Sequence, residues 1–284
     1  MVKKIVVGYD GTSSSAEAVL WAANEAVVRK VPLRMVACYD VPAVGDAMSG
    51  FPASEVYAIA INDIQASLNE MRDVAVAKYP QIKLECISSP GPASVALLTD
   101  VTAADLIVMG ASSHHGKAAF WLGSTPRSVI HHSPCPVVIV RGAISRGRPD
   151  RVVVGIDGSE ASERAVRWAA DEAGRHQVEL LVAHGWWYPY VFVEDSMSQA
   201  RDLTRVDAEI VLDKAVGVAR DVCATKVTHQ LVEAGPASAL LDTVRDGDLL
   251  VLGSHGHGAI TAGLIGSTVN SVLERSAVPV VVVT

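Results

Sequence analysis

The chain of 284 residues is long enough for two domains, each with a hydrophobic core of its own. Half of its residues are hydrophobic and only 19% are charged, which argues against intrinsic disorder. The formal net charge of -7 provides no basic footprint for nucleic acid or for an anionic membrane, so we expect no nucleic-acid partner. Any site for a polyanion must therefore be formed by a small group of residues and not by the overall charge of the chain.

Cysteine spacing and hydropathy favour a cytoplasmic protein. The four cysteines are far apart with no paired spacing, which favours reduced, packed thiols over a disulfide or zinc framework. The sequence enters an apolar strand within a few residues of Met1, which leaves no room for a signal peptide. The uncharged stretch 249–273 is long enough to span a bilayer, but its glycines, histidines and hydroxyl groups favour a buried strand and a loop. We expect no integral membrane contact.

The same series of predicted elements occurs twice along the chain. Each half has an apolar strand that ends in an acidic residue, a helix with a serine-rich start, and a second strand. A long helix, a third strand, a short helix after a Gly-Pro-Ala-Ser segment and two further strands follow. The first half places the beginning of this series at 4–11, 33–38, 54–78 and 83–88, and the second half at 151–158, 179–184, 198–223 and 226–232.

A glycine-rich loop follows the fourth strand in both halves. In the second half, Gly253-Ser254-His255-Gly256 comes directly after an apolar run, and Gly266-Ser267-Thr268 precedes a helical pattern. Such a loop aims the free N–H groups of a helix start at whatever lies above the strand, and an anion is the natural occupant. The first half repeats the pattern at Met109-Gly110 and Gly123-Ser124-Thr125. This repetition favours one architecture that occurs twice, and it makes a surface loop without a ligand the weaker interpretation.

Apolar strands that alternate with helices predict an α/β fold with parallel sheets covered on both faces. The acidic ends of the first strands and the glycine loops after the fourth strands then lie at the same carboxyl edge of each sheet. Open α/β sheets bind ligands at that edge. The edge is therefore the predicted site.

The signature Gly253-x-x-Gly256, nine residues, then Gly266-Ser267 resembles the ATP-binding signature of the universal stress protein family. The strand that ends in Asp157 and the final Val-Pro-Val-Val-Val-Val strand are also similar to that family, and the resemblance covers essentially the whole chain. It implies two tandem Rossmann-like (adenine nucleotide alpha hydrolase-like) domains, 1–142 and 151–284, joined by a linker at 143–150. Each would be a five-stranded parallel sheet of order 3-2-1-4-5 with helices on both faces.

The resemblance also implies an ATP site, with Mg²⁺ accompanying the nucleotide. Asp157 would meet the ribose or the adenine side, Gly185 would offer its backbone to adenine, and Gly266 with its neighbours would hold the phosphates. His255 or His257 would touch a phosphate. In the second domain the implied nucleotide-binding positions are Gly155, Ile156, Asp157, Gly185, Leu252, Gly253, His255, Gly256, Gly266, Ser267 and Thr268. In the first domain they are Gly8, Tyr9, Asp10, Tyr39, Met109, Gly110, Ser113, Gly116, Gly123, Ser124 and Thr125.

The first domain departs from the family pattern at two positions. Ser113 stands where the signature has glycine, and a positive φ there would cost about 1–2 kcal/mol, which Gly116 would relieve by moving the turn. Pro126 removes one N–H group from the helix start. We therefore expect the second site to bind ATP more reliably than the first.

Catalytic and metal-binding interpretations have little support in the sequence. Asp10 and Asp157 are well placed for general bases, but turn capping or ribose orientation is the stronger interpretation. No second carboxylate or nucleophile has a constant position in both halves, so at most slow ATP hydrolysis is expected. The adjacent histidines lack metal-ligand spacing, and no dedicated metal site is expected.

The resemblance implies a nucleotide-dependent regulator of stress response or growth. The alternatives are a scaffold or interaction module in which the nucleotide is structural or absent, and a weak ATPase or phosphotransferase. The fifth strands are expected at sheet edges, so the two domains are predicted to pair within one chain. A homodimer is a further expectation, and the sequence does not identify a regulatory protein partner.

Overall fold

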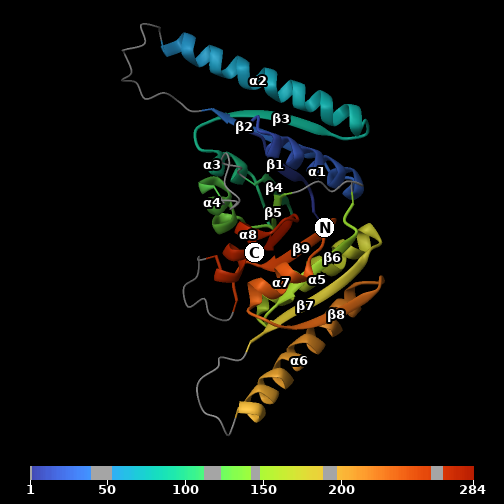
Figure 1. The fold of residues 1–284 in the computed structure, drawn as a ribbon. Coiled ribbons are helices and arrows are strands. Elements are labelled where there is room, and N and C mark those ends of the chain that lie inside the picture. The colour runs from blue at the N-terminus through green and yellow to red at the C-terminus, as the bar shows by residue number, and fades with distance from the viewer. Residues whose placement is uncertain (1, 40–52, 112–122, 142–147, 188–196, 257–264) are drawn as a thin grey trace. The chain divides into compact units, whose positions relative to one another are not determined.

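The computed structural model describes residues 2–39, 53–111, 123–141, 148–187, 197–256 and 265–284. These residues form two compact units, one ending at Arg141 and the other comprising the described residues from Arg148 onward. Each unit contains one parallel sheet with helices on both faces (Figure 1).

The first unit has five strands in the order β3-β2-β1-β4-β5, all parallel where they pair. Helices α1 and α2 contact each other and cover one face, while α3 and α4 contact each other and cover the other face. The elements are β1 (Ile5–Gly8), α1 (Ser13–Arg29), β2 (Leu33–Tyr39), α2 (Ala53–Lys78), β3 (Leu84–Pro90), α3 (Ala93–Leu98), β4 (Leu106–Gly110), α4 (Ser124–His132) and β5 (Val137–Val140).

The second unit repeats this arrangement with the strand order β8-β7-β6-β9-β10. Helices α5 and α6 pack together, as do α7 and α8. The elements are β6 (Arg151–Ile156), α5 (Glu160–His176), β7 (Glu179–Trp186), α6 (Met197–Val222), β8 (Val227–Glu233), α7 (Pro236–Thr243), β9 (Asp248–Gly253), α8 (Ser267–Arg275) and β10 (Val280–Val283). The predicted order 3-2-1-4-5 is thus confirmed in both units.

The central strands form the core because both of their faces are covered. The first three residues of β1, the first four of β4, the last five of β6 and the first five of β9 are buried. Continuous burial explains why these strands are uninterrupted apolar runs rather than alternating patterns. The outer strands β3 and β8 are more exposed.

Matching caps start the first helix of each unit. The side chain of Thr12 accepts a hydrogen bond from the Ser15 N–H at 3.2 Å, and that of Ser159 accepts one from the Ser162 N–H at 3.1 Å. Such a side chain satisfies one of the N–H groups that a helix start leaves without a partner. The caps confirm the predicted serine-rich starts, and they fix the turn between each first strand and its helix.

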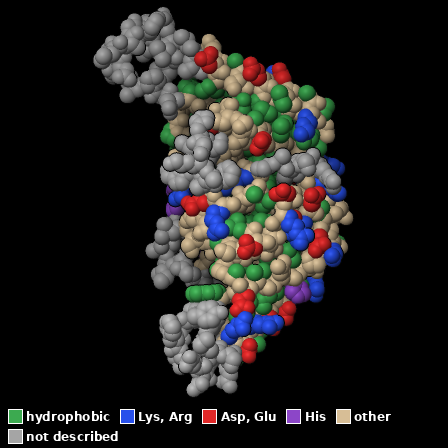
Figure 2. Space-filling view, in the orientation of Figure 1, with side chains coloured by type: hydrophobic (Ala, Val, Ile, Leu, Met, Phe, Trp, Pro, Cys, Tyr) green, Lys and Arg blue, Asp and Glu red, His purple; other side chains and the backbone are tan. Residues whose placement is uncertain are grey.

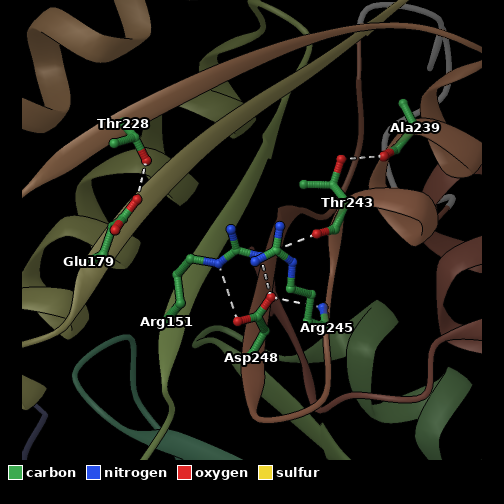
Figure 3. Close-up of polar contacts among 7 residues, drawn as sticks. All are labelled: Arg151, Glu179, Thr228, Ala239, Thr243, Arg245 and Asp248. Atoms are coloured by element: carbon green, nitrogen blue, oxygen red, sulfur yellow. Dashed lines mark hydrogen bonds and ion pairs between the residues drawn. The ribbon is translucent and has the colours of Figure 1, made fainter.

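An ion pair holds the amino ends of β6 and β9 together in the second unit (Figure 3). Arg151 donates to Asp248 from Nε at 3.2 Å and from a terminal nitrogen at 2.6 Å, and the backbone N–H of Arg245 donates to the same carboxylate at 2.9 Å. Arg151 also donates to the carbonyl of Thr243. This cluster lies at the opposite end of the strands from the predicted site, so we infer that it stabilises the fold and does not bind a ligand.

No helix in the described part of the chain is long and apolar enough to cross a membrane. All four cysteines are free thiols. Burial raises the pKa of the Cys135 thiol to about 11. Its counterpart in the second unit is the buried Val278, so Cys135 behaves as a packed apolar residue.

Candidate functional site

A cavity of about 510 Å³ opens at the carboxyl edge of the first sheet. The ends of β1 and β4, the first turns of α1 and α4, and the side of α3 surround it. Its lining includes predicted nucleotide-binding positions from the turn after β1 and from the end of β4 to the start of α4. These positions are Gly8, Tyr9, Asp10, Met109, Gly110, Gly123, Ser124 and Thr125. The fold therefore brings together residues that are more than 100 positions apart in the sequence.

Asp10 projects from the turn after β1 at the edge of this cavity. Its Oδ1 accepts hydrogen bonds from the Thr12 hydroxyl at 2.6 Å and from the Thr12 N–H at 3.1 Å. Partial burial on its own would raise the pKa of Asp10, but the hydrogen bonds from Thr12 and Ser15 outweigh it and lower the pKa below the ordinary value of 3.8. The cavity thus has an ionised carboxylate on its rim at neutral pH.

The strand register assigns Cys38, rather than Tyr39, to the position of Gly185. Gly8 lies opposite Val36 in the first unit, and Gly155 lies opposite Ala183 in the second. Two residues further along, Cys38 and Gly185 are equivalent. The side chain of Cys38 lines the cavity, whereas Tyr39 is not among its lining residues. Counting from the end of the strand had shifted this sequence assignment by one residue.

Cys38 also lines an adjoining cavity of about 440 Å³ between the starts of α3 and α4. The same Ala93, Ser124 and Thr125 border both cavities. Other lining residues that the sequence did not indicate include Thr12, Ser14, Leu97 and Ala111. Their contribution depends on how helices pack over the strand ends, which no local sequence signal encodes.

The second unit brings its predicted acidic residue and its glycines together in the same way. Oδ1 of Asp157 accepts a hydrogen bond from the Ser159 N–H at 3.0 Å, and Oδ2 of Asp157 lies directly beside the Cα of Gly256. The Gly266 N–H donates to the carbonyl of Ser254 at 3.1 Å. The contact between Asp157 and Gly256 joins the loop after β9 to the turn after β6, and the Gly266 hydrogen bond links the two ends of that loop. These contacts also confirm that each aspartate caps the turn that follows its strand.

Most of the glycines at the two edges allow close packing within the protein. A Cβ at Gly110 would lie 2.5 Å from the Ser14 carbonyl oxygen, and one at Gly253 would lie 2.7 Å from the Ala161 carbonyl group. A Cβ at Gly155 would clash with the side chain of Leu240 at 2.6 Å. These glycines are needed by the packing of α1, α5 and α7, whatever they do for a ligand.

Gly266 is different because neither packing nor backbone geometry requires a glycine there. Its φ is -58°, which any residue adopts, and a Cβ would have its nearest neighbour at 3.6 Å. Gly266 is the N-cap residue of α8, and Gly123 is the N-cap residue of α4. Neither helix start has a side-chain cap hydrogen bond. The free N–H groups, the Ser267 and Thr268 hydroxyls and the space at Gly266 fit a phosphate group.

His184, which the sequence did not indicate, lies beside the second site. Its Nδ1 hydrogen bonds with the carbonyl oxygen of Ile156 at 2.7 Å, so the ring bridges the ends of β6 and β7. Ile156 and Leu252 are buried near the carboxyl ends of β6 and β9. His255 is exposed, and its Nδ1 lies 2.8 Å from the Ser254 hydroxyl.

Several sequence assignments concern positions elsewhere in the loops. Ser113, Gly116 and His257 lie outside the described residues. Pro126 is the third residue of α4. Its missing N–H still belongs to the first turn, where helix N–H groups have no partner within the helix, so Pro126 removes one potential donor without breaking the helix.

Comparisons with known proteins match one family over the full length of the chain. A model described as "Universal stress protein family" matches residues 1–141 and again residues 149–284. Universal stress protein Rv2005c of Mycobacterium tuberculosis is 32% identical over 289 residues, covering 98% of this chain and 96% of the relative. Universal stress protein Rv2623 of the same species is 29% identical over 293 residues, covering 98% and 95%.

A solved structure supports the fold. The crystal structure of a universal stress protein from Archaeoglobus fulgidus matches with a TM-score of 0.69 and 20% identity, covering 99% of this chain and 98% of that one. The family model, the full-length relatives and the repeated five-stranded sheets all agree. This chain belongs to the universal stress protein family and carries two copies of the family's domain.

Proposed function

We propose that this protein binds ATP, accompanied by Mg²⁺, in at least its second domain, and that it acts in the cytoplasm as a nucleotide-dependent regulator of stress response or growth. The domains in this proposal are 1–142 and 151–284, with 143–150 as the linker. The regulatory role is drawn from family membership, and the binding step is drawn from the sites.

The observation that carries nucleotide binding is the cavity at the carboxyl edge of the first sheet, together with the matching turn at Asp157 and the uncapped start of α8 in the second unit. The cavity volume of approximately 510 Å³ lies within the usual range for a small-molecule pocket. Its lining includes the ionised Asp10 and the uncapped start of α4, with Gly123 and Ser124. A carboxylate suits ribose hydroxyls, and a helix start suits phosphates, so a nucleotide matches both features of the lining.

Preference for the second domain follows from Gly256 and Gly266. Gly256 keeps the loop backbone against Asp157, a contact that any Cβ would disrupt. The corresponding residue in the first domain is Ser113. Gly266 leaves room directly above the start of α8, where a phosphate would lie. A phosphate at this position would accept hydrogen bonds from the N–H groups of the helix start.

Native mass spectrometry of the purified protein and ATP titration with Mg²⁺ test the proposal. Gly266→Asp adds a negative charge where the phosphate is expected, and Gly266→Ala is its matched control because the structure has room for a methyl group. We expect Gly266→Asp to weaken binding at least about tenfold through charge repulsion, with a much smaller effect of Gly266→Ala. Gly123→Asp makes the same change in the first domain.

The outcomes separate the candidate functions. Adenine nucleotide at one or two copies per chain, reduced by Gly266→Asp, supports the proposal and counts the working sites. A larger effect of Gly123→Asp than of Gly266→Asp would overturn the preference for the second domain. No binding at millimolar ATP would leave a scaffold or interaction module as the function. A phosphorylated product that requires Asp157 would instead indicate a phosphotransferase.

A further inference from the structure

Helix α6 packs on the second sheet through one face only. Ala208, Leu212, Val216 and Ala219 form this face, and each is at most 6% exposed. They recur at intervals of three and four residues, as expected for one side of a helix, and α6 contacts α5, β7 and β8. This apolar face accounts for the attachment of α6 to its unit.

A second apolar row lies on the outer side of the same helix. Leu203, Val206 and Ile210 are 68%, 49% and 62% exposed. Their spacing of three and then four residues aligns them along about 10 Å of helix, and at 100° per residue the row points away from the buried face. Single exposed apolar residues are common on protein surfaces, but an aligned row opposite the packing face is not needed to hold this helix in place.

Acidic residues flank this outer apolar row. Asp202 and Asp213 lie along one side of it and Asp207 along the other, and no ion pair joins these three carboxylates to another residue in the described part of the chain. The nearby cations are already paired. Arg205 lies 3.0 Å from Glu209 and Arg201 lies 2.6 Å from Glu233, while Lys214 approaches Glu163 at 3.7 Å.

A hollow of about 690 Å³ adjoins the side of the row that carries Asp202 and Asp213. Its lining comprises those two residues, paired Arg201 and Arg205, Trp186 and part of β8. In Figure 2, basic and acidic side chains lie close together over the region of α6. The hollow gives long side chains from a partner space to reach the free carboxylates beside the row.

We propose that Leu203, Val206 and Ile210 form a docking face for a short amphipathic helix of another protein, with lysine or arginine on both sides of its apolar stripe. The apolar stripe would pack on the row, as in other helix-on-groove complexes. The partner's cations would meet Asp202, Asp207 and Asp213, which supply the charge complementarity. This face is separate from the nucleotide site, and the proposal does not depend on ATP binding.

A second copy of this chain fits the face less well. In an antiparallel pair centred on Val206, Ile210 of one copy would meet Asp202 of the other. The acidic side of each helix would then face its own counterpart, which is repulsive. Two turns of helix also offer far less than the approximately 800 Å² per partner of a standard stable interface. A small face with unpaired carboxylates suits a transient, basic partner.

The probe for this proposal is a synthetic helical peptide of about 18 residues with leucine at i, i+3 and i+7 and lysine beside them. Its fluorescence anisotropy is followed on titration with the full chain at about 100 mM salt. We expect a Kd on the order of 10 μM, in the range of weak interfaces. A peptide with glutamate in place of lysine should bind at least about tenfold more weakly.

Substitutions on the exposed surface distinguish the face from non-specific attraction. The double substitution Leu203→Ser, Ile210→Ser should weaken binding of the basic peptide at least about tenfold. Val222 is an exposed residue of α6 away from the row, and Val222→Ser should change the Kd of the peptide less than about twofold. Asp202→Asn with Asp213→Asn should weaken binding several-fold and reduce its salt dependence. Nucleotide titration of the same variants should be unchanged.

Three results would overturn the proposal. One is a wild-type protein that does not bind the basic peptide. Another is equal binding by wild type and by the Leu203→Ser, Ile210→Ser variant. The third is a concentration-dependent dimer of the wild type in analytical ultracentrifugation that the same double substitution abolishes, which would assign the row to self-association.

Discussion

Single glycines at the carboxyl edges serve two distinct purposes. Gly253 is required by the protein itself because the first turn of α5 fills the space where its side chain would be. At Gly266, a Cβ would come no closer than 3.6 Å to the described residues, and φ is ordinary. The sequence predicts both as ligand positions because both belong to one motif. Only the packing of α5 against the end of β9, which is a tertiary contact, separates a structural glycine from one that leaves room for a ligand.

Gly253→Ala should therefore destabilise the protein. The added methyl group would lie 2.7 Å from the Ala161 backbone, which must shift, and overpacking of this kind costs about 1–3 kcal/mol. Gly217→Ala is the matched control, because Gly217 lies in α6 with no neighbour within 4 Å of the new Cβ. We expect that control to be neutral or stabilising by up to about 1 kcal/mol. Urea unfolding measures both, and equal stability of the two variants would contradict the argument.

Asp10 provides a prediction for acid pH. Because hydrogen bonds lower its pKa in the folded state, the carboxylate contributes stability above its unfolded pKa of about 4, and this contribution disappears as the pH falls through the lower folded value. Asp10→Asn should be less stable than wild type by about 1 kcal/mol near neutral pH. The difference should close as the pH drops below about 4. Urea unfolding at several pH values tests this, and a gap that widens in acid would show the opposite sign.

At the scale of elements, the sequence predicts the two long helices to within one residue at each end, because their apolar periodicity is sustained. The ends of the second strands are harder to predict: β2 runs to Tyr39 and β7 to Trp186, beyond the predicted ends at 38 and 184. That extension is why Tyr39 was aligned with Gly185 in place of Cys38. Register is set by pairing with β1 and β6, which sequence spacing alone does not define.

The pairing of β6 with β9 also depends on a buried ion pair. Asp248 is 3% exposed and accepts from Arg151 and from the Arg245 backbone (Figure 3). Asp248→Ala would leave the Arg151 guanidinium without its main partner, so we expect a loss of about 3 kcal/mol. Asp171→Ala, which breaks an exposed pair with Arg175 on α5, should cost less than about 1 kcal/mol. Similar urea midpoints for the two variants would argue against a stabilising role for the buried pair.

The whole molecule is a duplication, and the sequence predicts this well because the strands, caps and glycine loops recur at matching offsets. Cavity shape and the exposed row on α6 were not predicted, since both depend on how helices lie over strands that are distant in the sequence. Among the described residues, the cavity at a carboxyl edge is in the first unit, although the motif is more complete in the second. The expected pairing of the fifth strands concerns the placement of the units and stays a prediction.

Each unit contains a complete sheet, covered on both faces by its own helices, so each should fold by itself. We expect residues 149–284 expressed alone to unfold in one cooperative urea transition, because all five strands of this sheet pair with one another within the segment. If the second site is self-contained, this segment should also bind one ATP, and Gly266→Asp should weaken that binding as it does in the full chain. A segment that folds cooperatively but binds no ATP would overturn the assignment of a working site to the second domain. A segment without a cooperative transition would mean that the core of the second unit needs the first, and the two copies of the domain would then be one folding unit.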